Sequence, residues 1–338
     1  MEKPKVRISV RNLVEFILRS GDLDNSRGSS GDKEAMLKGG RLHRKIQRSM
    51  KGNYQAEVSL KRESEYEDVI IQVEGRADGI FTEDGEFWID EIKGTYGNLQ
   101  AMEVPVPVHR AQAMCYGWIY GEKEGLSQIG IQMTYSHLDT EDTRRFREIF
   151  SMEELKNWYQ KLLDDYHKWI SCSLSWKKER NASMKDLQFP FPYREGQREI
   201  VSGVYHTVSS KKTLFVQAPT GVGKTMSAIF PSVRAIGEGK GETLFYLTAK
   251  TITGTVAWEA FHTLRENGLK FKVTAITAKE KLCFLDSPEC TPEKCPYAKG
   301  HFDRVNDAVY ELWTTEEVYS REVIRAHAEK WQVCPFEM

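Results

Sequence analysis

The sequence of 338 residues predicts an α+β domain over residues 1–180, followed by an incomplete α/β domain that ends in a cysteine-rich segment. Three observations predict this order. Strand-like runs follow two helical patterns within the first part of the chain. Residues 177–192 join a charged run to Phe-Pro-Phe-Pro, which is typical of a linker. Beyond that stretch, apolar runs alternate with helical patterns, which is typical of a parallel sheet with crossover helices.

The first domain is expected to open with a helix that Ser9 caps and that ends near Gly21. A second helix and a meander of four strands follow, with a turn at Asp84-Gly85 before the last strand. A helix, two strands and a long helix complete the α+β order. We expect these elements at residues 33–50, 54–60, 68–74, 76–82, 87–93, 109–120, 128–135, 143–150 and 152–170.

The second domain is expected to begin after the linker. Strands are predicted at residues 214–217, 243–247 and 271–276, with helices starting at Lys224 and after Thr253. From about residue 279 the periodicity ends, and four of the six cysteines lie in this last part. We therefore divide the chain into residues 1–180, 181–278 and 279–338.

The composition is that of a globular chain, with 40% hydrophobic and 29% charged residues. No stretch approaches the roughly 18 consecutive apolar residues that a membrane span needs. The N-terminus lacks the apolar core of a signal peptide. We therefore expect a cytoplasmic protein that does not contact a membrane, and the oligomeric state stays open.

The distribution of charge is uneven although the formal net charge is only −1. Residues 1–52 hold 13 Lys or Arg and 6 Asp or Glu, whereas residues 53–100 hold 4 and 12. A basic surface attracts phosphate backbones, and an acidic one attracts divalent cations. Two ordinary solvated faces would explain the same charges.

A phosphate-binding loop is predicted at Ala218-Pro219-Thr220-Gly221-Val222-Gly223-Lys224-Thr225, between an apolar run and a helical pattern. Gly221 and Gly223 let backbone N–H groups approach the phosphates of ATP, Lys224 supplies a charge, and the Thr225 hydroxyl can bind magnesium. A fortuitous glycine-rich turn is the alternative. The loop resembles that of superfamily two helicases, in which alanine commonly replaces the first glycine. Upstream, Tyr193-Arg194-Glu195-Gly196-Gln197 resembles a helicase Q motif, which implies that Gln197, with Arg194 beside it, contacts adenine; an ordinary polar helix start is the alternative.

Carboxylates gather in the acidic meander. Glu91 and Lys93 alternate along one strand and so point to the same face, where Asp78 of the preceding strand can meet them. Two carboxylates in reach can hold Mg2+ or Mn2+, which polarises a phosphate and lowers the pKa of a bound water. Lys93 would then position that water or stabilise the developing charge. A solvated cross-strand ion pair is the alternative interpretation.

These residues resemble the motifs of the RecB-type PD-(D/E)XK nucleases over residues 7–170. The family pattern is a histidine on a preceding helix, Gly-x-x-Asp, Glu-x-Lys and Gln-x-x-x-Tyr, matched here by His43, Gly75 to Asp78, Glu91 to Lys93, and Gln112 to Tyr116. The resemblance implies that His43, Asp78 and Glu91 bind the metal and that Gln112 and Tyr116 contact DNA. Asp90-Glu91-Ile92-Lys93 also resembles a helicase Asp-Glu-x-His box, but it precedes the P-loop and lacks the histidine.

Four cysteines predict a metal site rather than disulfides. Gaps of 6, 4 and 38 residues separate Cys283, Cys290, Cys295 and Cys334, which fits neither a zinc ribbon nor a ferredoxin. The arrangement and Cys334-Pro335-Phe336-Glu337 resemble the iron–sulfur domain of XPD/DinG-type helicases, which implies a 4Fe–4S cluster. Structural zinc is the alternative. Cys115 and Cys172 are interpreted as ordinary buried thiols.

The resemblances together imply the N-terminal portion of a nuclease–helicase fusion, with a RecA-like motor that stops before its Asp-Glu-Ala-His box. Such a protein would act on DNA in repair, on single strands or on duplexes with single-stranded ends. ATP hydrolysis is expected to be inactive without the rest of the motor. The alternative is a non-catalytic DNA-binding module. Cleavage mode, unwinding polarity and substrate structure are left open.

Overall fold

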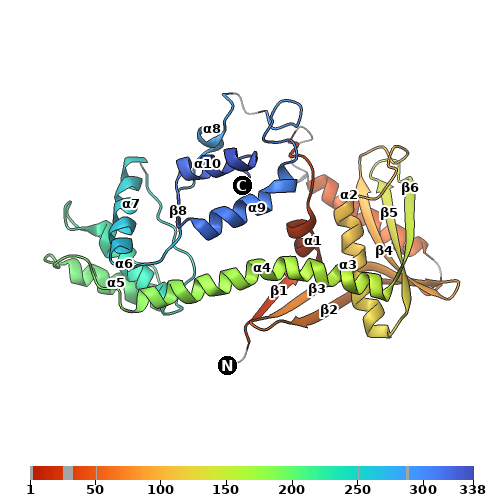
Figure 1. Cartoon of the computed structure of the whole chain (residues 1–338), viewed down its shortest axis with the longest axis horizontal. Helices are drawn as coiled ribbons and strands as arrows, with labels where there is room; N and C mark the ends of the chain where they lie inside the picture. The colour runs from red at the N-terminus through yellow and green to blue at the C-terminus, as the bar shows by residue number, and fades with distance from the viewer. Residues whose placement is uncertain (1–2, 26–32, 51, 250, 287–288) are drawn as a thin grey trace. The chain divides into compact units, whose positions relative to one another are not determined.

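The computed structural model describes residues 3–25, 33–50, 52–249, 251–286 and 289–338 (Figure 1). The chain forms two compact units. The first comprises Met1–Ser171, Lys279–Tyr310 and Ala328–Met338, and the second comprises Cys172–Ala278 and Glu311–His327. The residues of the cysteine-rich segment are thus shared between the two units.

The first unit is built on a mixed sheet to which the described residues contribute six strands. These are β1 (Lys5–Ser9), β2 (Gln55–Glu65), β3 (Ile70–Glu83), β4 (Glu86–Thr95), β5 (Gln128–His137) and β6 (Thr143–Ser151). β1 pairs with β3 and β4 with β5 in parallel, whereas β2–β3, β3–β4 and β5–β6 are antiparallel. The combination of this sheet with helices confirms the predicted mixture of α and β structure.

Helices flank this sheet. Its strands contact α1 (Val10–Leu18), α2 (Lys33–Ser49) and α3 (Pro107–Glu124), and α4 (Met152–Lys185) follows β6. The last part of the chain adds the short α8 (Lys279–Leu282), α9 (His301–Thr315) and α10 (Arg321–Trp331). The predicted cap of α1 is confirmed, because the Ser9 side chain accepts a hydrogen bond from the Asn12 backbone N–H at 3.1 Å. α3 is buried on every side from Ala111 to Gly121, which explains why its apolar residues do not form a single stripe.

Two predictions about the meander need correction. Residues 68–74 and 76–82 do not form separate strands, because β3 runs without a break through Gly75. The glycine serves close packing instead of a turn, as described below. β1 was not predicted, because its five residues carry too short a pattern and pair with β3 far along the chain. The turn at Asp84-Gly85 is confirmed, with φ values of 51° and 85°.

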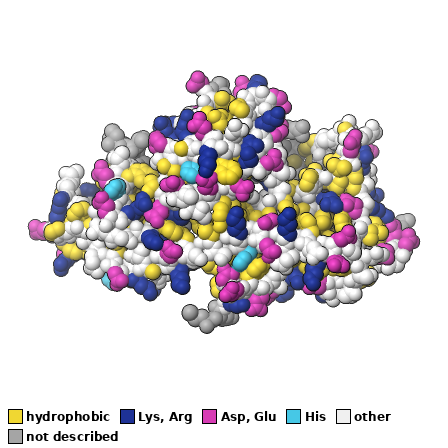
Figure 2. Space-filling model, viewed as in Figure 1, with side chains coloured by type: hydrophobic (Ala, Val, Ile, Leu, Met, Phe, Trp, Pro, Cys, Tyr) yellow, Lys and Arg dark blue, Asp and Glu magenta, His cyan; other side chains and the backbone are white. Residues whose placement is uncertain are grey.

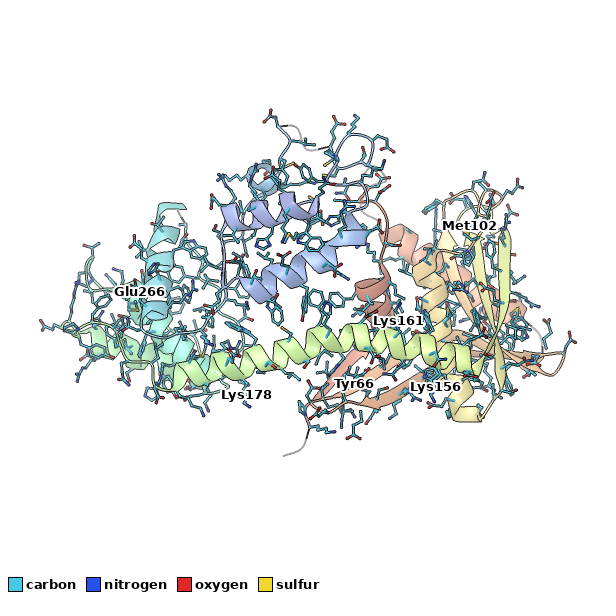
Figure 3. The ribbon with its side chains drawn as sticks, in the orientation of Figure 1. Tyr66, Met102, Lys156, Lys161, Lys178 and Glu266 are labelled. Atoms are coloured by element: carbon cyan, nitrogen blue, oxygen red, sulfur yellow. The ribbon has the colours of Figure 1, made fainter. Side chains whose placement is uncertain are left out.

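The predicted linker also needs correction at its start. α4 continues through residues 177–185 instead of ending near Ile170. Lys, Glu, Arg and Ala are good helix formers, and no glycine or proline interrupts the helix before Pro190. Lys156, Lys161 and Lys178 are exposed along its length (Figure 3). A charged run therefore marked a solvated helix rather than a loop.

The second unit contains α5 (Gln197–Ser209), α6 (Lys224–Gly237), α7 (Thr251–Glu266) and a short parallel pair, β7 (Val273–Thr274) and β8 (Val318–Tyr319). The predicted helices at Lys224 and after Thr253 correspond to α6 and α7. The strands predicted at residues 214–217 and 243–247 are not formed, and Phe215 and Leu247 are 92% and 85% exposed. An apolar run has strand geometry only when a neighbouring strand accepts its backbone hydrogen bonds, and none does so among the described residues.

The end of the chain is more regular than predicted. α9 and α10 lie in the segment where we expected no periodicity. Each carries an apolar stripe that includes Ala308 or Ala328, and both residues are fully buried in one small core. The short strand β8 separates the two helices, so no single periodic pattern spans this segment.

The surface carries charged side chains of both signs. Lys and Arg side chains are interspersed with Asp and Glu on the face shown in Figure 2. In the described part of the chain, the structure contains no helix with the length and apolar character that crossing a bilayer requires.

Candidate active site, nucleotide loop and cysteine site

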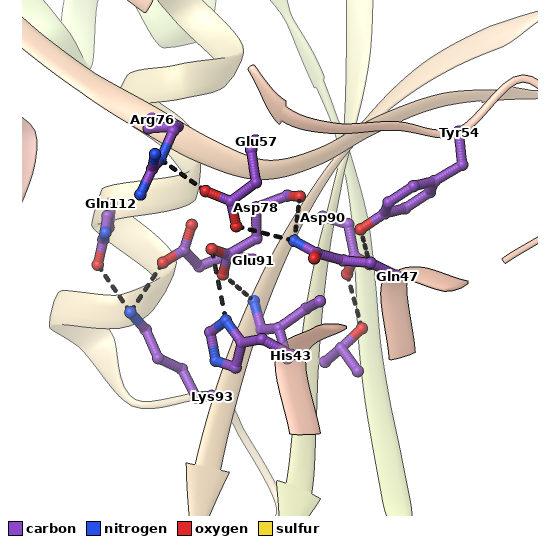
Figure 4. A network of polar contacts seen from close by, with 12 residues as sticks. His43, Gln47, Tyr54, Glu57, Arg76, Asp78, Asp90, Glu91, Lys93 and Gln112 are labelled. Carbon is purple, nitrogen blue, oxygen red and sulfur yellow. Dashed lines mark hydrogen bonds and ion pairs between the residues drawn. The ribbon is translucent and has the colours of Figure 1, made fainter. Parts of the chain in front are cut away.

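The first candidate site lies where β3 and β4 separate (Figure 4). The last pair of their ladder joins Gly79 to Asp90. Beyond this pair, a side chain replaces the backbone as the hydrogen-bond acceptor: Oδ2 of Asp78 accepts a hydrogen bond from the Ile92 backbone N–H at 2.7 Å. This hydrogen bond holds the carboxylate of Asp78 against β4, the strand that carries Glu91.

Two helices complete this site. His43 of α2 places its Nδ1 atom 3.6 Å from Oδ1 of Asp78. The Lys93 ammonium lies 2.8 Å from Oε1 of Glu91 and donates a hydrogen bond to Oε1 of Gln112 on α3, at 3.0 Å. Tyr116, one turn further along α3, contacts Gln112. The structure thus brings together the six residues proposed from the sequence, which are His43, Asp78, Glu91, Lys93, Gln112 and Tyr116.

Glu91 is the electrostatically unusual member of this group. Only 1% of the residue is exposed, and its Oε2 atom has no hydrogen-bond partner among the described residues. Burial, assisted by the nearby charge of Asp78, raises the pKa of Glu91 to about 8. A buried carboxylate oxygen without a donor is stabilised by a cation, so the residues present fit a hard divalent metal ion.

A ready-made metal geometry is not present at either candidate metal site. Within the described ranges, no three His, Cys, Asp or Glu side chains converge as a preformed site. Around Asp78 and Glu91, protein partners occupy most of the oxygen atoms, as the contacts with Ile92 and Lys93 illustrate.

Three further residues of the site were missed by the sequence analysis. Gln47 donates to the backbone oxygen of Asp78 at 2.9 Å and to Glu57 at 3.0 Å. Glu57 also contacts Nε of Arg76 at 2.6 Å. Gln47 follows His43 by four residues, so helical spacing places both on one face, and this signal was available. Nothing in the sequence reveals Glu57.

Glu57 has an unusual backbone conformation. It lies opposite Asp78 in the register between β2 and β3, but its φ of 59° takes it out of the ladder. A residue with a side chain rarely adopts this left-handed conformation, and such strain persists where the surroundings fix it. Here the contacts with Gln47 and Arg76 hold the carboxylate toward the site.

Asp90 belongs to a different network on the other side of β4. It is fully buried and accepts hydrogen bonds from Thr134 Oγ1 at 2.6 Å, Gln132 Nε2 at 3.0 Å and the Tyr54 hydroxyl at 3.0 Å. Burial raises the pKa of Asp90 against the opposing effect of these bonds. This network ties β4 to β5 and so supports the strand that carries Glu91.

The predicted phosphate loop lies in the second unit, directly before α6. Gly221 and Gly223 have φ values of 85° and 83°, which are the left-handed conformations for which glycine is suited. The Lys224 ammonium donates to the backbone oxygens of Ala218 and Pro219, each at 2.8 Å. The lysine is thus folded over its own loop, where its charge satisfies two carbonyl groups.

Residues of the proposed Q motif lie against this loop. The Arg194 guanidinium donates to the backbone oxygen of Gly221. Gln197 is buried, and its Oε1 accepts a hydrogen bond from the Arg194 backbone N–H at 3.0 Å. A Cβ atom at Gly223 would lie 2.6 Å from Nε2 of Gln197. The loop and the two upstream residues therefore form one local structure, in which the hydroxyl of Tyr246 also donates to Thr225 at 3.2 Å.

The four clustered cysteines line a single small cavity in the first unit. Cys295 and Cys334 are buried, and Cys283 and Cys290 are partly exposed. Burial raises the pKa of Cys334, against the effect of hydrogen bonds from the backbone of residues 336 and 337. The Lys279 ammonium lies beside the thiol of Cys290, and this contact raises the pKa of Lys279.

Thiolate ligands are stabilised by hydrogen-bond donors that point at their sulfur atoms. The Leu285 backbone N–H donates to Sγ of Cys283 at 3.4 Å, in addition to the donors at Cys290 and Cys334. N–H groups and a cation stabilise the deprotonated sulfur that binds metal. Four cysteine thiols around one cavity are the donor set that structural zinc or an iron–sulfur cluster takes, although they do not converge as a preformed site among the described residues. Of the remaining cysteines, Cys115 is buried as predicted, whereas Cys172 of α4 is partly exposed, so the prediction of a buried thiol was wrong there.

Comparison with known proteins gives limited information. No family model matches the chain. A segment of 47 residues, 14% of this chain, is 40% identical to the probable ATP-dependent helicase MJ0942 of Methanocaldococcus jannaschii. That segment spans 7% of the helicase, so the likeness covers a small part of either protein. The crystal structure of SSO0001 superposes on 48% of this chain and 78% of its own with 20% identity and a TM-score of 0.32, which is too low to establish a shared fold.

Proposed function

We propose that the first unit carries a metal-dependent DNA nuclease of the PD-(D/E)XK type, joined to a helicase-type nucleotide-binding segment and an iron–sulfur site. The observation that carries the nuclease proposal is the buried Oε2 atom of Glu91, which lacks a hydrogen-bond partner in the described part of the chain and belongs to the group that Asp78, Lys93 and His43 complete. Burying a carboxylate is costly even beside one cation, and groups with such perturbed pKa values cluster at functional sites.

The residues have distinct roles in this proposal. His43, Asp78 and Glu91 would hold Mg2+ or Mn2+, which when bound supplies Lewis-acid polarisation of a phosphate and a more acidic water. Lys93 holds a proton and a positive charge where negative charge develops during hydrolysis. Gln112 orients Lys93 through the 3.0 Å hydrogen bond, and Tyr116 supports Gln112.

The charge of α2 supports a nucleic acid substrate. This helix carries His43 and six Lys or Arg residues against one Glu. Arg41, Arg44 and Arg48 lie near His43 in the sequence, and a basic helix attracts phosphate backbones. The short helicase likeness agrees with a nucleic-acid-related role. We propose single-stranded DNA, or DNA with single-stranded ends, as the substrate.

The P-loop supports binding of ATP in the second unit. The left-handed conformations of Gly221 and Gly223 allow the loop backbone to approach phosphates, and α6 begins at Lys224. A RecA-like motor that unwinds DNA with ATP is the proposed wider architecture. Robust binding of ATP by the chain, lost in Lys224→Ala, would support this part.

The cysteine cavity supports a 4Fe–4S cluster. Protein prepared without oxygen should be brown, with absorption near ~400 nm from sulfur-to-iron charge transfer. Cys290→Ser should remove most of this absorption, while Cys172→Ser should not. A colourless preparation that holds one equivalent of zinc would show that the four cysteines bind structural zinc instead of a cluster.

The nuclease proposal is tested on the whole chain with labelled single-stranded DNA and Mg2+ or Mn2+. Glu91→Gln, which keeps the shape of the side chain, is expected to lower cleavage by at least about a hundredfold, because metal-site catalysis supplies several kcal/mol. Glu103→Gln is the matched control, since Glu103 is exposed. Equal cleavage by both variants would remove Glu91 from the mechanism. Tight DNA binding without cleavage by the unaltered protein would favour the non-catalytic binding module.

A further inference from the structure

A short segment that follows α1 is joined to the cysteine-rich segment by backbone hydrogen bonds. The Leu23 backbone N–H donates to the Ala298 oxygen at 2.8 Å, and that of Asn25 donates to the Cys290 oxygen at 2.9 Å. Both acceptors belong to the stretch that holds the first three clustered cysteines. The contact therefore links an N-terminal segment directly to the backbone of a proposed ligand.

The same segment also caps the start of α9. Oδ1 of Asp22 accepts a hydrogen bond from the Gly300 backbone N–H at 2.6 Å, and Oδ1 of Asp303 accepts one from Gly21 at 2.8 Å. The Phe302 backbone N–H donates to the Gly21 oxygen at 2.9 Å. Carboxylates at a helix N-terminus satisfy its otherwise unpaired N–H groups, so the two segments stabilise each other reciprocally.

Leu23 carries the contact into the cysteine cavity. It is 5% exposed and packs with Cys295, Ala298 and Cys334. The same cavity is lined by Leu23 and by all four clustered cysteines. An apolar side chain at this position limits the access of water to the buried side of the cavity, where Cys295 and Cys334 lie, and solvent access is one of the properties that decide how a thiolate-held group behaves.

We propose that residues 21–25 form one wall of the cysteine site, so that loading of the four cysteines orders this N-terminal segment and the segment in turn protects the loaded site. The inference rests on the proposed metal or cluster at these cysteines. The described residues between Cys283 and Gly300 form turns and bends but no helix or strand, and such stretches gain order when bound metal links their ligands. The hydrogen-bond acceptors of Leu23 and Asn25 lie in this stretch, so their order depends on the same linkage.

Hydrogen exchange tests the first half of the proposal on the whole chain. The backbone amides of Leu23 and Asn25 should be protected in protein loaded with iron and sulfide, or with zinc if that is the metal bound. Stripping the metal with a chelator should accelerate their exchange by about tenfold or more, because their acceptors become mobile. Amides of the central strand β5 serve as the internal control and should change little. Unchanged exchange at Leu23 and Asn25 after stripping would overturn the coupling.

A pair of matched variants tests the second half. Leu23→Ala should speed loss of the ~400 nm absorption in air, or of zinc to a chelator, by about tenfold or more, since burial of a leucine is worth at least that factor. Leu37→Ala, at a site that is 64% exposed, should leave the rate unchanged. Equal rates of loss in the two variants would contradict the proposed role of Leu23 but not the proposed metal site. Absence of any metal from the unaltered protein would sink both.

Discussion

Gly75 of β3 and Tyr116 of α3 are in direct contact: a Cβ atom added at Gly75 would come within 2.7 Å of the tyrosine hydroxyl oxygen. The hydroxyl hydrogen-bonds with Gln112 and with the backbone of Arg76, and burial raises the pKa of Tyr116 to about 12. This contact explains why glycine stands three residues before Asp78: without a side chain, Gly75 lets α3 approach β3 closely. The Gly-x-x-Asp motif and the Gln-x-x-x-Tyr motif, which are separate in the sequence, therefore pack against each other.

Replacing Gly75 by alanine should disturb both stability and the site. The added methyl group must displace Tyr116 or shift β3, at a cost of about 1–3 kcal/mol in the free energy of unfolding. Denaturant unfolding and DNA cleavage measure the two effects. Gly39→Ala is the control, since no atom lies within 4 Å of its added Cβ and the helix α2 should gain about 0.5–1 kcal/mol. A Gly75→Ala protein as stable as the unaltered chain would contradict this packing.

The strained Glu57 predicts a role in holding Arg76. Glu57→Gln should weaken the 2.6 Å contact with Arg76 and leave its guanidinium free to move away from the proposed substrate site. We expect the KM for single-stranded DNA to rise several-fold while kcat changes less. Glu63→Gln, on the same strand β2, removes an equal charge and should have little effect. A larger change in kcat than in KM would indicate that Glu57 acts on the reacting groups instead.

The sequence identified the six residues of the proposed motifs, but not the neighbouring Gln47, Glu57 and Arg76 or the contacts that hold the group together. Glu91 and Lys93 share a face because strands alternate, and the order of the motifs supplied the rest. The sequence motif identified Gln112 as a site residue but did not predict that it accepts a hydrogen bond from Lys93. The position of Glu57 depends on a left-handed φ, which no residue pattern specifies for a side chain other than glycine.

Contacts between distant segments were likewise beyond sequence patterns. Leu23 looks like an isolated apolar residue, and its partners Cys295 and Cys334 lie at the other end of the chain. The apolar runs at 214–217 and 243–247 matched strands in composition but lack strand neighbours in the described part of the chain. Periodicity reports which side of an element is buried, whereas pairing depends on what lies beside it.

A pH dependence is expected at the ion pair that joins α3 to β6. Arg110 donates two hydrogen bonds to Glu148, at 2.9 and 2.6 Å, and this contact lowers the pKa of Glu148. The folded protein therefore keeps Glu148 ionised to lower pH than the unfolded chain does. The stabilisation is fully present above the ordinary pKa of 4.5 and is lost as the pH falls through the lower pKa of the folded state.

Glu148→Gln should therefore reduce the free energy of unfolding at pH 7 by about 1 kcal/mol or less, since the side chain is 40% exposed. The difference from the unaltered protein should shrink at acidic pH. Urea unfolding at several pH values measures it, and Arg110→Ala with the double variant completes a mutant cycle. A difference that grows as the pH falls would reverse the assigned sign.

The phosphate loop predicts that one lysine controls nucleotide affinity. In the structure the Lys224 ammonium bonds to the oxygens of Ala218 and Pro219, and a nucleotide would replace these carbonyl groups with charged phosphate oxygens. A hydrogen bond to a charged group is worth about 1.5–3 kcal/mol, so Lys224→Ala should weaken ATP binding by about ten- to a hundredfold. Calorimetry or a fluorescent ATP analogue measures the change.

Two companion variants sharpen this last prediction. Lys240→Ala removes an exposed charge after the same helix and should bind ATP like the unaltered protein. Gly223→Ala should lose affinity without loss of charge, because alanine disfavours a φ of 83° and its Cβ would lie 2.6 Å from Gln197 Nε2. Loss in both Lys224→Ala and Gly223→Ala locates the nucleotide at this loop, because one variant alters charge and the other alters backbone. Equal affinity in all three variants would place ATP elsewhere or show that the chain does not bind it.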